Sequence, residues 1–207
     1  MNVALTIGGV ARGNESCGRV AVSIFRYIRP ALHLLFSTKN AYTIRGEGHL
    51  MLKRTLQEDL DRAVAYHGHL CGGQYIGTRI ARLALNYFHI EDADTYRDLI
   101  AFVECDRCLA DAICSVANCK LGRRRLKWFD YGIMSASFYD IATGKAIRIS
   151  QRPEVPRCPK GQSYVEFYAP YTDAQMFRVH EVELPDLTEC DLPGKPRKTE
   201  ICAKCGE

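Results

Sequence analysis

A glycine-rich segment at residues 67–73 (HGHLCGG) constrains the fold more than any other part of this chain of 207 residues. Before it, apolar residues recur every four positions and predict an amphipathic helix over residues 51–66. These positions are Leu52, Leu56, Leu60 and Val64. After it, apolar periodicity predicts a second helix over residues 74–88. Because glycines permit backbone conformations that other residues resist, we expect a tight turn between two helices.

This turn carries two imidazoles and a thiol, from His67, His69 and Cys71. Imidazole and thiolate are the ligands that zinc and other late first-row metals prefer. The same placement favours a second interpretation, in which Cys71 is a nucleophile and His69 its base, because a helix N-terminus favours a thiolate. A third is that the histidines only cap the preceding helix. We expect a metal site or a catalytic thiol.

A second candidate group follows a continuous apolar run at residues 99–104, which predicts a buried strand. Cys108 lies just beyond this strand, and Asp111 lies one helical turn later, before a short helix predicted at residues 111–116. Cys108 and Asp111 are therefore further candidate metal ligands. Free cysteines are also common as small buried hydrophobes, and we expect that role for Cys114.

The remaining core predicts mainly strands, at residues 125–131, 133–140, 145–151, 163–168 and 178–184, with a hairpin turn at 142–144 and a short helix at 172–177. Helices followed by a run of strands indicate an α+β fold, with a mixed or antiparallel sheet flanked by helices. A basic run at residues 122–128 could contact phosphates, but a solvated strand edge explains it better. We therefore expect no nucleic-acid partner for this run.

The predicted organisation has three parts: an extension at residues 1–50, an α+β core at 51–184, and a linker with a partial zinc finger at 185–207. The net charge of +4 belongs to the first part, since Lys and Arg balance Asp and Glu in the rest. A purine-rich coding run before the Met51 codon makes Met51 a possible natural start. Cys202 and Cys205 have zinc-knuckle spacing, but a structural zinc needs four ligands.

The ten cysteines are clustered as in metal or thiol sites, and a chain of this length can bury a core without disulfides. We expect a reduced, cytoplasmic protein. The apolar stretch at residues 21–36 is interrupted by arginines and a proline, which argues against a membrane span or signal peptide.

Several motifs in order resemble the FmdE family, which comprises one subunit of formylmethanofuran dehydrogenase and its stand-alone relatives, from about Met51 to Glu207. They are residues 67–73 (HGHLCGG), 104–113 (ECDRCLADAI), 118–122 (NCKLG), 130–132 (DYG) and 202–207 (CAKCGE). The resemblance implies an α+β core, a C-terminal treble-clef-like zinc finger and an intertwined homodimer. Two features depart from it: Gly72 stands where many relatives have proline, and the finger lacks a second cysteine pair.

By position, the resemblance implies a metal-bearing cleft lined by His69, Cys71, Cys108 and Asp111, with His67 and Cys119 nearby. Cys202 and Cys205 would form half of the finger. The chain has no molybdopterin or tungsten machinery and no ferredoxin-type cysteine pattern, so it is not a formylmethanofuran dehydrogenase on its own.

The leading hypothesis is a homodimeric protein that binds zinc or another late first-row metal at His69 and Cys71, with a redox-related accessory role. If it is an enzyme, Cys71 is the metal ligand or nucleophile and His69 the co-ligand or base. The alternative is a metal-sensing or regulatory module that contacts a protein or nucleic acid through the terminal finger.

Overall fold

The computed structural model describes residues 52–184, 187, 191–194, 201 and 203–206. The proposed extension and Met51 lie outside these residues, as do Cys190 and Cys202. Among the described residues no helix combines the length and apolar character needed to cross a membrane.

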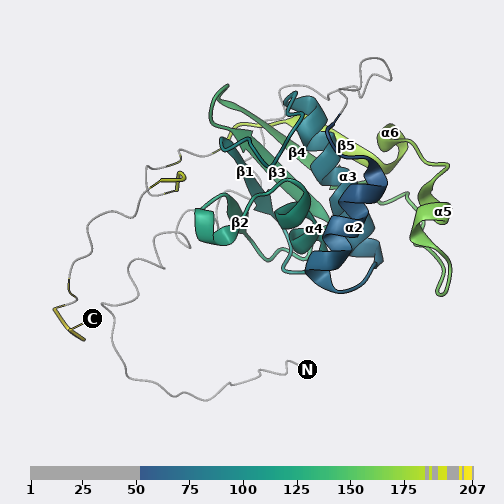
Figure 1. Ribbon diagram of the computed structural model, residues 1–207, viewed down its shortest axis with the longest axis horizontal. Coiled ribbons are helices and arrows are strands. Elements are labelled where there is room, and N and C mark those ends of the chain that lie inside the picture. The colour runs from purple at the N-terminus through teal and green to yellow at the C-terminus, as the bar shows by residue number, and fades with distance from the viewer. Residues whose placement is uncertain (1–51, 185–186, 188–190, 195–200, 202, 207) are drawn as a thin grey trace, which may run out of the picture. The chain divides into compact units, whose positions relative to one another are not determined.

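The core is an α+β arrangement, as predicted, in which helices cover one face of a five-stranded sheet (Figure 1). The helices are α2 (Leu56–His67), α3 (Gly72–Tyr87), α4 (Cys108–Val116), α5 (Tyr164–Tyr168) and α6 (Asp173–Met176). The strands are β1 (Leu99–Val103), β2 (Leu126–Trp128), β3 (Ser135–Asp140), β4 (Lys145–Gln151) and β5 (Phe177–Glu181). A short 3-10 helix, η1 (Leu121–Arg123), precedes β2.

The sheet has the strand order β2-β1-β3-β4-β5. β1 pairs in parallel with β2 and antiparallel with β3, and the other pairs are antiparallel, so the sheet is mixed. Alternate strand residues, such as Leu99, Ala101 and Phe138, join helix residues in one apolar core. Because side chains alternate between the two faces of a strand, this pattern packs the helices on one face.

Two elements differ from the sequence prediction. α2 begins at Leu56 rather than at residue 51, because Thr55 and Glu58 form a capping box that starts the helix. The prediction of a strand at residues 163–168 is wrong. These residues form α5, because the Ser163 side chain accepts a hydrogen bond from the Glu166 backbone N–H and caps a helix.

The basic run before β2 is not a uniformly solvated edge. Arg125 is only 2% exposed and donates to the backbone carbonyls of Tyr96 and Asn118. Arg123 is exposed, and Arg124 caps η1 in the left-handed region. Arg125 therefore ties the loop before β1 to the segment before β2, a structural role for a residue of this run.

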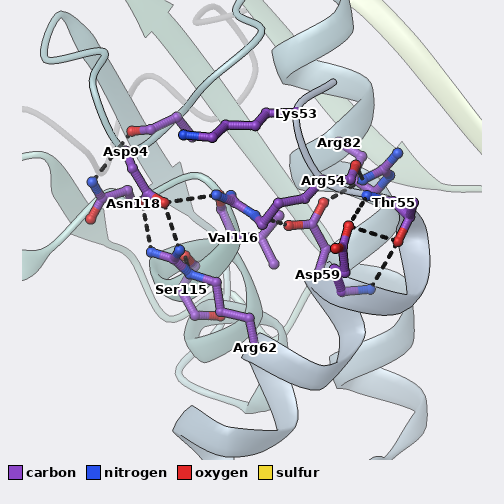
Figure 2. A network of polar contacts seen from close by, with 12 residues as sticks. Lys53, Arg54, Thr55, Asp59, Arg62, Arg82, Asp94, Ser115, Val116 and Asn118 are labelled. Carbon is purple, nitrogen blue, oxygen red and sulfur yellow. Dashed lines mark hydrogen bonds and ion pairs between the residues drawn. The ribbon is translucent and has the colours of Figure 1, made fainter. Parts of the chain in front are cut away.

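A polar network joins the start of α2 to the end of α4 (Figure 2). Asp59 is buried and pairs with the guanidinium groups of Arg54 and Arg82. Arg54 also donates to the carbonyl of Val116, and Arg62 donates to that of Ser115. These carbonyls lie in the last turn of α4, where helices leave carbonyl groups without intrahelical partners.

Candidate metal centre

The predicted turn lies between α2 and α3 and brings His67, His69 and Cys71 together. His67 is the last residue of α2, and Gly68 ends that helix with φ of 98°, a conformation that favours glycine. Cys71 is the N-cap of α3 in extended conformation, and its carbonyl accepts from the Tyr75 backbone N–H at 3.0 Å. The turn therefore presents the cysteine at a helix N-terminus, as expected.

The other two glycines of the turn have a different role from the one predicted. Gly72 and Gly73 are the first residues of α3, and neither has a positive φ. A Cβ on Gly73 would lie 2.8 Å from the Cβ of Cys108. The missing side chain at Gly73 therefore permits α3 to pack directly on the start of α4, rather than shaping the turn.

One ligand atom from each of His67, His69 and Cys71 lies within 4.8 Å of the other two. Around a tetrahedral ion with bonds of about 2.0–2.3 Å, two ligand atoms lie about 3.3–3.8 Å apart, so side-chain rotations that move these atoms by about 1 Å would place all three on a single metal. The two imidazole rings have centroids 4.8 Å apart and are tilted by 38°. The donor set of two imidazoles and one thiolate suits zinc or another late first-row metal.

The hydrogen bond of His67 to Asp111 leaves the Nε2 nitrogen of the ring available for a metal. Its Nδ1 lies 2.8 Å from Oδ2 of Asp111, and because a carboxylate only accepts, Nδ1 carries the proton. The other nitrogen, Nε2, is buried and has no hydrogen-bond partner. A buried, unpartnered acceptor on a histidine that belongs to a group of three close ligand residues fits a metal ion, and a carboxylate on the opposite nitrogen is the usual support for such a histidine.

Asp111 is therefore placed as the partner of His67. It was predicted as a metal ligand, and the structure places its carboxylate against Nδ1 of His67. Its side chain is half exposed, while that of His67 is largely buried.

Cys108 is the first residue of α4 and adjoins Cys71, although it is outside the group of three close ligand atoms. Burial raises the pKa of the Cys108 thiol, and the neighbouring Cys71 thiol raises it further. Cys108 is thus brought to the site as the sequence suggested, but as a neighbour of Cys71.

The other described cysteines are outside the group of three close ligand atoms. Cys119 was expected near the cleft, but it is fully buried, its thiol donates to the carbonyls of Leu99 and Ala117, and burial raises its pKa to about 12. Cys114 is buried, as predicted. Cys205 is exposed, and its predicted partner Cys202 lies outside the described residues.

Two residues of the site were not found from the sequence. Gln74 is fully buried, and its side-chain amide donates to the Cys108 carbonyl at 2.6 Å. Tyr164 in α5 packs on Gly72, where an added Cβ would lie 3.3 Å from its ring. A glutamine among the apolar residues of the second predicted helix was a weak signal, and the wrong strand prediction concealed Tyr164.

A hollow of about 410 Å³ lies elsewhere, lined by residues of α2, α3 and the α5–α6 region. None of the predicted ligands lines it. Its charged residues are already paired, Arg79 with Asp173 and Arg82 with Asp59.

The fold and the turn define an α+β protein with a histidine–cysteine cluster suited to a metal at a helix N-terminus. A family profile described as FmdE, Molybdenum formylmethanofuran dehydrogenase operon, matches residues 66–182, which include the turn and the whole sheet. The chain belongs to this family.

Two further proteins are similar. A probable S-adenosyl-L-methionine-binding protein of Archaeoglobus fulgidus is 30% identical over 91 residues, which are 42% of this chain. The matched region spans only 25% of that relative's length. An FmdE-like protein of the tungsten formylmethanofuran dehydrogenase type from Syntrophus aciditrophicus, solved by crystallography, is 20% identical with a TM-score of 0.49, covering 81% of this chain and 89% of the other.

Proposed function

We propose that this protein is a cytoplasmic homodimer that binds zinc or another late first-row metal through His67, His69 and Cys71, in an accessory role related to redox metabolism. The observation that carries the metal site is the pairing of His67 with Asp111, which leaves a buried, unpartnered Nε2 on a residue grouped with two other ligand residues. The accessory role rests on the family alone.

Each residue of the turn has a defined part in this proposal. Nε2 of His67, a ring nitrogen of His69 and the Cys71 sulfur supply three protein ligands. Sites with three protein ligands keep a further position for water or substrate, where the metal acts as a Lewis acid. Asp111 holds the proton on Nδ1 of His67, so that Nε2 keeps its lone pair for the metal.

Elemental analysis of the full-length protein tests the metal site directly. Wild type purified without chelator should contain close to one equivalent of metal from this turn, and Cys71→Ser should lose it. Cys158→Ser is the matched control, because Cys158 is also partly exposed but its thiol contacts only the Pro159 and Gln162 carbonyls. Unchanged metal content in Cys71→Ser would refute the proposal.

The terminal finger is tested by the same measurement. Cys202→Ser should lower the metal content only if Cys202 and Cys205 hold an ion, a requirement of the alternative regulatory module. Light scattering on the eluting protein measures whether the chain is a dimer.

A further inference from the structure

Two thiols meet where α3 and α4 begin. Cys71 caps α3, Cys108 opens α4, and the two thiols are close enough to interact, with Cys108 packed against Gly73 two residues after Cys71. Both are free thiols and both are partly exposed. A small thiol reagent can therefore reach either residue, and the second thiol is adjacent to the first.

Backbone packing independent of the thiols holds these two helix starts together. Gly73 leaves room for the Cys108 Cβ, to which a methyl group at Gly73 would approach within 2.8 Å. The buried Gln74 amide donates to the Cys108 carbonyl at 2.6 Å. Since these contacts come from residues two and three positions after Cys71, they keep Cys108 beside it.

Among the described cysteines, Cys114 and Cys119 also interact with each other, but both are buried. Cys105 shares a C-x-x-C spacing with Cys108, yet it is 2% exposed, and burial raises the pKa of its thiol. The thiol of Cys114 contacts the Tyr66 hydroxyl, and that of Cys119 contacts backbone carbonyls. The spatial arrangement thus favours Cys71 as the partner of Cys108, a pairing that the sequence spacing does not indicate.

We propose that Cys71 and Cys108 form a reversible disulfide, and that this modification removes Cys71 from the metal-ligand group. The second part rests on the proposed function. A low-molecular-weight disulfide is the oxidant. The Cys71 thiolate attacks it and releases one thiolate; Cys108, after losing its proton to solvent, attacks the Cys71 sulfur and releases the second. The two electrons lost by the protein thiols as the S–S bond forms thus reduce the oxidant to two thiols.

Glutathione disulfide and metal-free, full-length protein provide the first test. After alkylation and trypsin digestion, peptide 63–79, whose only cysteine is Cys71, should be linked to peptide 108–120 through Cys108. Fragmentation separates Cys108 from Cys114 and Cys119 on the second peptide. The link should disappear with dithiothreitol and in Cys108→Ser or Cys108→Ala, and it should persist in Cys158→Ser.

Two results would overturn the pairing: Cys71 retained only as a thiol or a glutathione adduct in wild type, or linkage of Cys108 to Cys105. Circular dichroism of both Cys108 variants verifies that they are folded. Because this experiment uses no metal, it is independent of whether the proposed metal site is correct.

Zinc-loaded protein provides the second test. At a fixed ratio of glutathione to its disulfide, wild type should release zinc to a chromophoric chelator as the link forms. Cys108→Ser should need a ratio about tenfold more oxidising, because it lacks the intramolecular step with its high effective concentration. Zinc that stays bound while the Cys71–Cys108 link forms would refute the regulatory part, whereas failure of zinc to bind at all would refute the proposed function instead.

Discussion

Nδ1 of His67 lies 2.8 Å from Oδ2 of Asp111, which joins the last residue of α2 to the first turn of α4. The bond fixes both the tautomer and the ring orientation of a proposed ligand. It also explains why an aspartate that was expected to bind metal lies on the far side of the histidine ring.

Removing this carboxylate should weaken metal binding. Asp111→Asn replaces an obligate acceptor with a neutral amide, so the Nδ1 proton is held less firmly, and we expect a loss of about 10- to 100-fold in zinc affinity. Competition with a chromophoric chelator measures the affinity. Asp106→Asn is the control, since Asp106 pairs only with the neighbouring Arg107, and an equal loss in both variants would contradict the role of Asp111.

The two adjacent glycines at the start of α3 should respond in opposite ways to alanine. Gly73→Ala introduces a methyl group 2.8 Å from the Cys108 Cβ and should lower the free energy of unfolding by about 1–3 kcal/mol. Gly72→Ala meets only the movable Tyr164 ring at 3.3 Å and gains about 0.5–1 kcal/mol of helix propensity, so it should be at least as stable as wild type. Urea denaturation measures both, and equal effects would show that Gly73 is not a packing requirement.

Asp59 should be the most sensitive residue of the network in Figure 2. It is 1% exposed and pairs with Arg54 and Arg82, so Asp59→Asn removes the counter-ion of the partly buried Arg82 and leaves Arg54 paired with Asp94. We expect a loss of about 3 kcal/mol in the free energy of unfolding, measured in urea. The exposed Asp61 on the same helix accepts only from Gln57, and Asp61→Asn should change stability by less than about 0.5 kcal/mol.

His180 on β5 should make stability depend on pH. Burial lowers its pKa, and so do the nearby charges of Arg148, Arg178 and Arg152. Below the ordinary histidine value of 6.5, the unfolded chain therefore binds this proton more readily than the folded chain, and stability falls as the pH falls. The fall levels off below the folded-state pKa.

His180→Gln should reduce this loss of stability in metal-free protein between about pH 8 and pH 5. Urea midpoints across that interval give the slope. A His180→Gln slope identical to that of wild type would contradict the assignment.

The sequence was most informative where a local pattern decides the structure. Residues 145–151 alternate and form β4 with the predicted bounds, and the turn at Gly144 has the positive φ that favours glycine. The error at residues 163–168 arose because their aromatic and β-branched residues favour a strand. Ser163 is also a local sequence signal, because a serine side chain can cap a helix, and the structure contains the helix that it favours.

The candidate site was predictable only in part. His67, His69 and Cys71 are close in sequence, so their proximity follows from one turn. The contacts of Asp111 with His67 and of Cys108 with Cys71 depend on how α4 packs against α2 and α3, and no spacing along the chain encodes that packing. The full burial of Cys119 was not predicted for the same reason, since the core, and not its motif, decides that burial.

The polar contacts of helix α2 with α4 include Arg62 on the Ser115 carbonyl and His67 on Asp111. The two contacts run in opposite order along the two helices, so together they fix the sliding register of an antiparallel pair. A slip by one turn, about 5.4 Å, would break both at once. The folded chain therefore orients the His67 imidazole, which we assign to the metal, before an ion binds. The entropy lost in ordering this ligand is then a cost of folding and not of metal binding.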